Sequence, residues 1–210
     1  MKNVILILFL FGVLFSSIFP INDTSAAPGD ITAVKTQSLG NNLEYGAMGK
    51  HTSLVQVDAD TYALAYSGAD EDGFISTFTI SSDGSTTLAE VESLEHDTAN
   101  GEFNSLVHVV GDTYALAYSG ADEDGDDSGD GFISTFDIDS GGDITPIKVA
   151  NHVELGEGSS VNLEHDATRG EYNSMVQVDA DTYALAYSGA DEDGFISTFT
   201  ISADGSTTLA

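Results

Sequence analysis

The sequence predicts an all-β protein of four-stranded antiparallel blades, arranged as a partial β-propeller of about three blades. One segment recurs three times along the chain, and the residues around it alternate with the period of two that β-strands show. The chain has no cysteine, so disulfides cannot hold it together. A hydrophobic core, bound metal or the stacking of repeats must do so instead.

The recurring segment reads DTYALAYSGADEDG and occupies residues 60–73, 112–125 and 181–194. A short apolar segment precedes each copy, and Phe-Ile-Ser-Thr-Phe follows it. The second repeat carries extra residues at 126–131 and between 138 and 164, where turns are expected and insertions are tolerated. We therefore predict blade-type repeats at about 51–102, 103–171 and 172–210.

A complete repeat contains segments that are typical of four β-strands. In the first repeat these are residues 54–57, 61–67, 74–80 and about 87–94. In the second strand, Tyr62, Leu64 and Tyr66 share one face, whereas Ala63 and Ala65 share the other. Both faces are apolar, so both are expected to be covered by neighbouring blades. The small alanine face would let the next blade approach closely.

The two ends of the chain bear on closure of the ring. Residues 29–35 resemble residues 142–148, which lead into the fourth strand of the second repeat, so the chain opens with a lone fourth strand. The third repeat stops where its own fourth strand should begin. Propellers normally have roughly four to eight blades, so the simplest hypothesis is the front of a longer sequence. A trimmed chain, an assembly between chains and an open stack are the alternatives.

Residues 1–27 are predicted to be a secretory signal peptide. Lys2 precedes an apolar run from Val4 to Phe19, and small residues lead to Ala27. The run is shorter than the ~20 residues that a membrane-spanning helix needs, which favours cleavage after Ala27 over an uncleaved anchor. No later segment is apolar enough to span a membrane, so residues 28–210 are expected to be secreted or on the cell surface.

The charge of the chain is strongly negative. It has 35 acidic and five basic side chains, for a formal net charge of −30. Nucleic acids and anionic membranes both need a positive footprint, so neither is an expected partner. Such a surface would attract divalent cations, or it would keep the protein soluble in concentrated salt.

These blades with aspartate-rich loops resemble the β-propeller repeats of secreted and cell-surface proteins, including the integrin-type FG-GAP repeats. The resemblance covers about residues 30–210 and implies blade architecture with Asp-rich calcium loops. The Phe-Gly and Gly-Ala-Pro signatures of FG-GAP repeats are absent, so the resemblance implies no ligand.

The Asp-Glu-Asp-Gly turns are candidate calcium loops. Two carboxylates two residues apart, with a glycine that permits a tight turn, can offer oxygens to calcium, although Asp-Gly is also an ordinary hairpin signal. These turns are residues 70–73, 122–125 and 191–194.

The second repeat offers a fuller metal loop. Asp124, Asp126, Ser128 and Asp130 carry oxygens at alternate positions, as in the first half of an EF-hand loop. Thr135 stands where such a loop has its bidentate glutamate, and no helices flank the segment. We predict structural calcium at these four residues, with a flexible acidic loop as the alternative.

No catalytic residue is predicted. His96-Asp97 and His165-Asp166 recur in matching Leu-Glu-His-Asp segments and could serve acid–base chemistry. They repeat with the blade, however, and no nucleophile accompanies them. A structural role is therefore the favoured interpretation.

The leading functional hypothesis is a non-enzymatic secreted or cell-surface module that binds an extracellular glycan or protein, braced by calcium. The alternative is the propeller part of a secreted polysaccharide-acting enzyme whose active site lies outside this sequence. A third hypothesis is that the acidity is a halophilic adaptation without bound metal. Near-identical repeats favour the first, because an active site usually breaks the symmetry at one blade.

Overall fold

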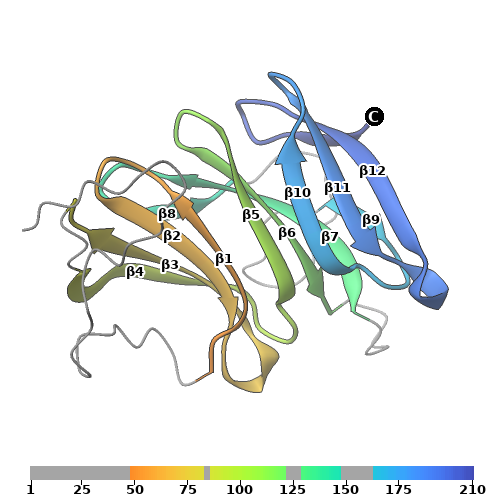
Figure 1. The fold of residues 1–210 in the computed structure, drawn as a ribbon, viewed down its shortest axis with the longest axis horizontal. Helices are drawn as coiled ribbons and strands as arrows, with labels where there is room; N and C mark the ends of the chain where they lie inside the picture. The colour runs from red at the N-terminus through yellow and green to blue at the C-terminus, as the bar shows by residue number, and fades with distance from the viewer. Residues whose placement is uncertain (1–47, 83–85, 122–128, 148–162) are drawn as a thin grey trace, which may run out of the picture. The chain divides into compact units, whose positions relative to one another are not determined.

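The computed structural model describes residues 48–82, 86–121, 129–147 and 163–210, all within one compact unit. These residues form three antiparallel sheets, joined by turns that include two single-turn 3-10 helices (Figure 1). The predicted all-β class and four-stranded blades are confirmed. The expected signal peptide lies outside the described residues. Among the residues described, no helix is long and apolar enough to cross a membrane.

Blade 1 and blade 3 have the same strand order. In blade 1, η1 (Ala69–Glu71) lies between the second and third of the strands β1 (Lys50–Gln56), β2 (Thr61–Ser67), β3 (Gly73–Ile80) and β4 (Thr86–Asp97). In blade 3, η2 (Ala190–Glu192) takes that place among β10 (Glu171–Gln177), β11 (Thr182–Ser188), β12 (Gly194–Ile201) and β13 (Thr207–Leu209). The first strand begins earlier than the sequence predicts, and β4 extends three residues further.

Blade 2 differs in its fourth strand, which is split. The blade consists of β5 (Glu102–Val110), β6 (Thr113–Gly120), β7 (Asp130–Ile138), β8 (Ile144–Pro146) and β9 (Leu163–Asp166). Both β8 and β9 pair with β7, one with each half of that strand. The insertion predicted between residues 138 and 164 therefore interrupts one strand and leaves the other three intact.

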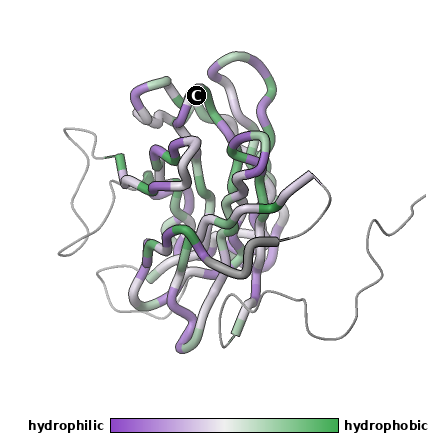
Figure 2. The backbone as a smooth tube through the Cα atoms, turned by 90° about the vertical axis from the view of Figure 1, so that its left-hand side faces the viewer, coloured by the Kyte–Doolittle hydropathy of each residue, from purple (hydrophilic) through white to green (hydrophobic). Residues whose placement is uncertain are grey.

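Cross-strand register gives every blade an aromatic face and a small face. In blade 1, Tyr62 pairs with Phe78 and Tyr66 with Phe74, while Ala65 pairs with Ile75 on the opposite side. Aromatic and β-branched pairs of this kind stabilise antiparallel sheets. Along the backbone, short hydrophobic and hydrophilic stretches alternate (Figure 2).

The blades stack small face on aromatic face. Ala63, Ala65 and Ile75 of blade 1 are 0% exposed. They share a core with the aromatic face of blade 2, which contributes Leu106, Tyr114, Leu116, Tyr118, Phe132, Phe136 and Ile138. The small face of blade 2 packs in the same way on blade 3: the second core joins Ala115, Ala117 and Ile133 to Met175, Tyr183, Leu185, Tyr187, Phe199 and Ile201. The close approach expected from the alanine face is confirmed.

Each interface also buries one histidine. His96 of β4 lies edge-on to Tyr118 of blade 2, with ring centroids 4.7 Å apart, and His165 of β9 meets Tyr187 of blade 3 at the same distance. Burial lowers the pKa of His96 to about 3, and the Asn104 side chain opposes this in part. Burial lowers the pKa of His165 to about 4. Both rings are therefore neutral packing elements at neutral pH.

Candidate functional site

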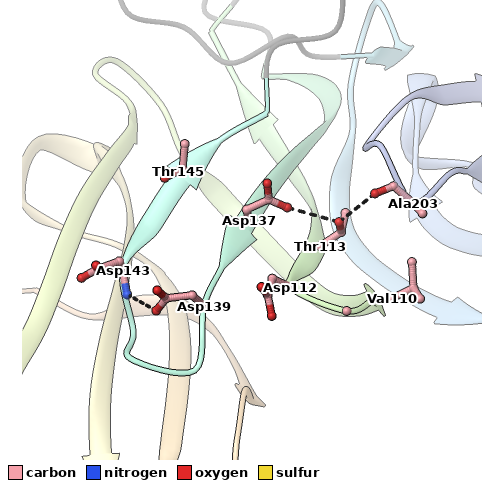
Figure 3. A pocket seen from close by; sticks show the side chains of 9 residues that line it. Val110, Asp112, Thr113, Asp137, Asp139, Asp143, Thr145 and Ala203 are labelled. Atoms are coloured by element: carbon pink, nitrogen blue, oxygen red, sulfur yellow. Dashed lines mark hydrogen bonds between the residues drawn. The ribbon is translucent and has the colours of Figure 1, made fainter.

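The candidate site is a pocket of about 550 Å³ at the edge of the interface between blades 2 and 3 (Figure 3). Four of its lining side chains are carboxylates, and none of the described residues that line it is basic. The lining residues are Val110, Gly111, Asp112, Thr113, Asp137, Asp139, Asp143, Thr145 and Ala203. Its size falls within the range of small-molecule binding sites.

Three of the four carboxylates are peculiar to blade 2. Asp137, Asp139 and Asp143 stand where blade 1 has Thr79, Ser81 and Ser85 and where blade 3 has Thr200, Ser202 and Ser206. Three hydroxyl side chains are thus replaced by three carboxylates, and all three line one pocket. In the same turn Gly141 replaces the aspartate of the other two blades, Asp83 and Asp204, so blade 2 gains two carboxylates here in net terms.

The turn between β7 and β8 positions Asp139 and Asp143, and Asp137 lies near the end of β7. The Oδ1 atom of Asp139 accepts backbone N–H bonds from Gly141 at 2.8 Å and from Asp143 at 3.0 Å. At Gly142 the backbone has φ +94°, a left-handed conformation that suits glycine. The Gly142 carbonyl accepts a 2.6 Å bond from Thr77 of blade 1. The acidic turn is therefore braced from within and from the preceding blade.

Blade 3 forms the other side of the pocket through Ala203. The Thr113 hydroxyl has a single proton, which can point to the Asp137 carboxylate at 3.2 Å or to the Ala203 carbonyl at 3.1 Å (Figure 3). Close by, the Thr135 hydroxyl donates to the Gly205 carbonyl at 3.0 Å. Thr113 thus lies between the Asp137 side chain and the backbone of blade 3, and it can hydrogen-bond to either one.

The pocket is a distributed set of hydrogen-bond acceptors rather than a metal cage. Within the described residues, no three Asp, Glu, His or Cys side chains converge closely enough to hold a metal ion. Several separate carboxylates suit a ligand that carries several donors, such as the hydroxyl groups of a sugar or the amines of a polycation. The negative charge around the pocket also raises the local concentration of cations.

The predicted metal loop lies mostly outside the described residues. This holds for Asp124, Asp126 and Ser128. Asp130 begins β7, where it is 2% exposed and pairs with Gly120. Calcium at these residues stays a prediction.

The Asp-Glu-Asp-Gly turn at residues 122–125 lies outside the described residues, and in the other two turns the glycine is not the residue that makes the tight turn. In blade 1 the left-handed residues are Asp70 and Glu71, with φ of 58° and 71°, and Gly73 instead opens β3. The glycine is needed because its α-carbon packs against the His96 ring. Blade 3 repeats this geometry at Asp191 and Glu192.

The sequence interpretation did not single out the pocket residues. The pocket residues are far apart in the sequence, and three separate turns contribute to the pocket. Ala203 reaches the segments that carry the carboxylates only because blade 3 packs on blade 2. One signal was present: an alignment of the three repeats shows Asp137, Asp139 and Asp143 as matching departures in a single blade.

No protein-family model and no curated protein matches the chain. Among solved structures, it is similar to an exo-1,5-α-L-arabinanase from a bovine ruminal metagenomic library, with a TM-score of 0.47 and 12% identity over 76% of this chain. It is also similar to an α-L-arabinofuranosidase from Lactobacillus brevis, with a TM-score of 0.42 and 9% identity over 77% of this chain. The chain spans 56% and 53% of those two proteins. Likenesses this low carry no argument about activity.

Proposed function

We propose that the chain is a non-enzymatic, propeller-type binding module for a glycan, and that the acidic pocket between blades 2 and 3 is its binding site. The proposal places the module outside the cell, in keeping with the signal peptide expected at residues 1–27. The observation that carries it is the replacement of three hydroxyl side chains by Asp137, Asp139 and Asp143 around one pocket.

A glycan fits the pocket better than a single ion does. Its hydroxyl groups are donors spread over a sugar ring, and the carboxylates are acceptors spread over two turns and the end of β7. Val110, which is 47% exposed at the rim, offers an apolar contact for the non-polar face of a sugar. An ion would need the carboxylates to converge, and among the described residues they do not.

The test uses the other blades as a guide to tolerated residues. Asp137→Thr, Asp139→Ser and Asp143→Ser together restore the side chains of blades 1 and 3, so the fold should be kept. The variant and the unchanged protein are compared for binding on an array of neutral glycans. Each lost charge-assisted hydrogen bond is worth about 1.5–3 kcal/mol, so binding should weaken at least ~10-fold.

The matched control changes the same amount of charge at the far end of blade 3. Asp191→Asn, Glu192→Gln and Asp193→Asn should leave glycan binding unchanged. Binding to no neutral glycan, or equal loss in both variants, would contradict the proposal. Binding of spermidine that added salt abolishes would identify a cation site instead. Cleavage of a bound polysaccharide would favour the enzymatic alternative.

A further inference from the structure

Two segments of nearly identical sequence have opposite environments. Residues 55–89 and 176–210 differ only at Ser82, which is replaced by Ala203. Ile75 is 0% exposed in blade 1, whereas the equivalent Ile196 of blade 3 is 78% exposed. We call the small face of blade 3 its open face, formed by Val176, Val178, Ala184, Ala186, Ile196 and Thr198.

The two interfaces within the chain show what covers such a face. The small faces of blades 1 and 2 each bury against the aromatic face of the following blade. In both cases a Tyr-x-Leu-x-Tyr strand supplies the core of the contact, as with Tyr114, Leu116 and Tyr118. The open face has the same residues as the small face of blade 1, so an aromatic face of the same kind can pack against it.

The polar contacts across the interfaces are equally regular. The Ser53 hydroxyl accepts the Leu106 N–H at 2.9 Å, and the Thr77 hydroxyl donates to the Gly142 carbonyl at 2.6 Å. Blade 2 repeats both contacts toward blade 3, through Ser105 to the Met175 N–H and through Thr135 to the Gly205 carbonyl.

The equivalent groups of the open face lack such partners. Ser174 and Thr198 are exposed, and neither side chain makes a hydrogen bond within the described part of the chain. The open face therefore carries two polar groups in the positions that join the other blades.

The edge of β12 is open as well. β3 pairs with β4 from Gly73 onward, whereas β12 pairs with β13 only from Phe199 to Ile201. A Cβ added at Gly73 would lie 2.6 Å from His96 Nε2, but one added at Gly194 would meet no atom of the described residues within 4 Å. The place that histidine fills in blades 1 and 2 is vacant beside Gly194.

An aromatic row leads to the same side of blade 3. His51, Phe103 and Tyr172 occupy matching positions on β1, β5 and β10, all with left-handed φ of 49°, 50° and 53°. Their ring centroids are 4.3 and 4.5 Å apart. Tyr172 ends this row and is 68% exposed.

We infer that blade 3 docks a further blade of the same repeat. The occupant supplies a Leu-x-His strand that pairs with the open half of β12, and an aromatic Tyr-x-Leu-x-Tyr face that covers the open face. We name a further blade rather than a second copy of this chain, because Leu64, Tyr66 and Phe78 on the aromatic face of blade 1 are already 8%, 5% and 4% exposed, with Tyr62 and Phe74 half-buried beside them. This inference does not depend on the proposed glycan site.

The experiment appends the proposed partner to the chain. Ala210 corresponds to Ala89, so a second copy of residues 90–147 placed after Ala210 continues the repeat in register. Because the chain has no cysteine, Ile196→Cys gives a single thiol on the open face. Maleimide labelling of that thiol should be at least ~10-fold slower in the extended chain than in the unextended chain. A matched extension, with the copies of Tyr114 and Tyr118 changed to aspartate, should give no protection.

Every outcome decides the inference. Protection by the first extension and not by the second supports it. An extension that stays unfolded by circular dichroism, or that folds without protecting the thiol, overturns it. Concentration-dependent protection in the unextended chain, with a dimer in sedimentation velocity, also overturns it, because a second copy would then be the occupant.

Discussion

Ala65 of blade 1 and Ala186 of blade 3 lie in identical stretches of sequence, and both sit on the small face of a central strand. Ala65 is completely buried, whereas Ala186 is exposed. The local fold is the same, since β2 and β11 both run for seven residues and pair with the following strand in the same register. The sequence of a blade thus determines its strands, and its neighbour determines their burial.

The comparison also shows where stability resides. Strand pairing is satisfied within each blade, but the apolar area of a small face leaves water only when the next blade covers it. Burial of apolar surface contributes roughly 25 cal/mol per Å². Stability in this chain should therefore concentrate at the two interfaces that bury the alanines of blades 1 and 2.

The largest expected effect comes from overfilling a small face. Ala65→Phe forces a ring into a fully buried position between two sheets, and we expect the free energy of unfolding to fall by about 3 kcal/mol. Ala186→Phe places the same ring on the open face, where it meets water. Urea unfolding followed by circular dichroism measures both. Equal losses in the two variants would mean that blade packing does not distinguish the two positions.

A smaller effect, of opposite sign at the two sites, is expected at the glycines that begin β3 and β12. In Gly73→Ala the added Cβ would meet His96 and lie 2.9 Å from the Gly101 α-carbon, which should cost about 1–3 kcal/mol. In Gly194→Ala the methyl group meets open space, so the reduced freedom of the unfolded chain should stabilise the protein by about 0.5 kcal/mol. Thermal melting of the pair checks this. A destabilised Gly194→Ala variant would contradict it.

Acid should weaken the occupied interfaces through their histidines. The pKa values of His96 and His165 are lowered to about 3 and about 4, so between those values and pH 6.5 the unfolded chain binds more protons than the folded one. The contribution of each histidine to the free energy of unfolding is therefore fully present above pH 6.5. Below pH 6.5 it falls, by about 1.4 kcal/mol per pH unit while the buried histidine stays neutral. Burial raises the pKa of Asp97, so its protonation acts in the opposite direction.

Single substitutions separate these contributions. Urea unfolding between pH 7 and pH 4.5 should show a shallower loss of stability in His96→Asn than in the unchanged protein. The effect of His165→Asn should be smaller, because His165 is less deeply buried. If the free energy of unfolding changes equally with pH in all variants, the histidines do not cause the loss of stability in acid.

The strands and the two faces could be predicted because they depend on local alternation. Tyr62 and Ala63 point to opposite sides in any strand, and the turn residues fix where the strand stops. The close approach of blades also followed, since alanine leaves room for a neighbour. These features need no knowledge of distant contacts.

The pocket and the strained turns could not be predicted in the same way. Asp137 acquires its setting only when Thr113 and Ala203 meet it from another strand and another blade. The local sequence also does not indicate that Phe103 adopts a left-handed backbone conformation, because glycine is the residue that usually adopts it. Such features depend on the packing of one repeat against the next.

The most direct test of the account compares one side chain in two places within identical local sequence. Ile75→Cys and Ile196→Cys each introduce a single thiol into a chain without cysteine. Maleimide labelling under native conditions should be at least ~10-fold slower at position 75, because that thiol reacts only when blades 1 and 2 separate. Labelling in urea supplies the common unfolded rate. Equal native rates would contradict the stacking of small face on aromatic face.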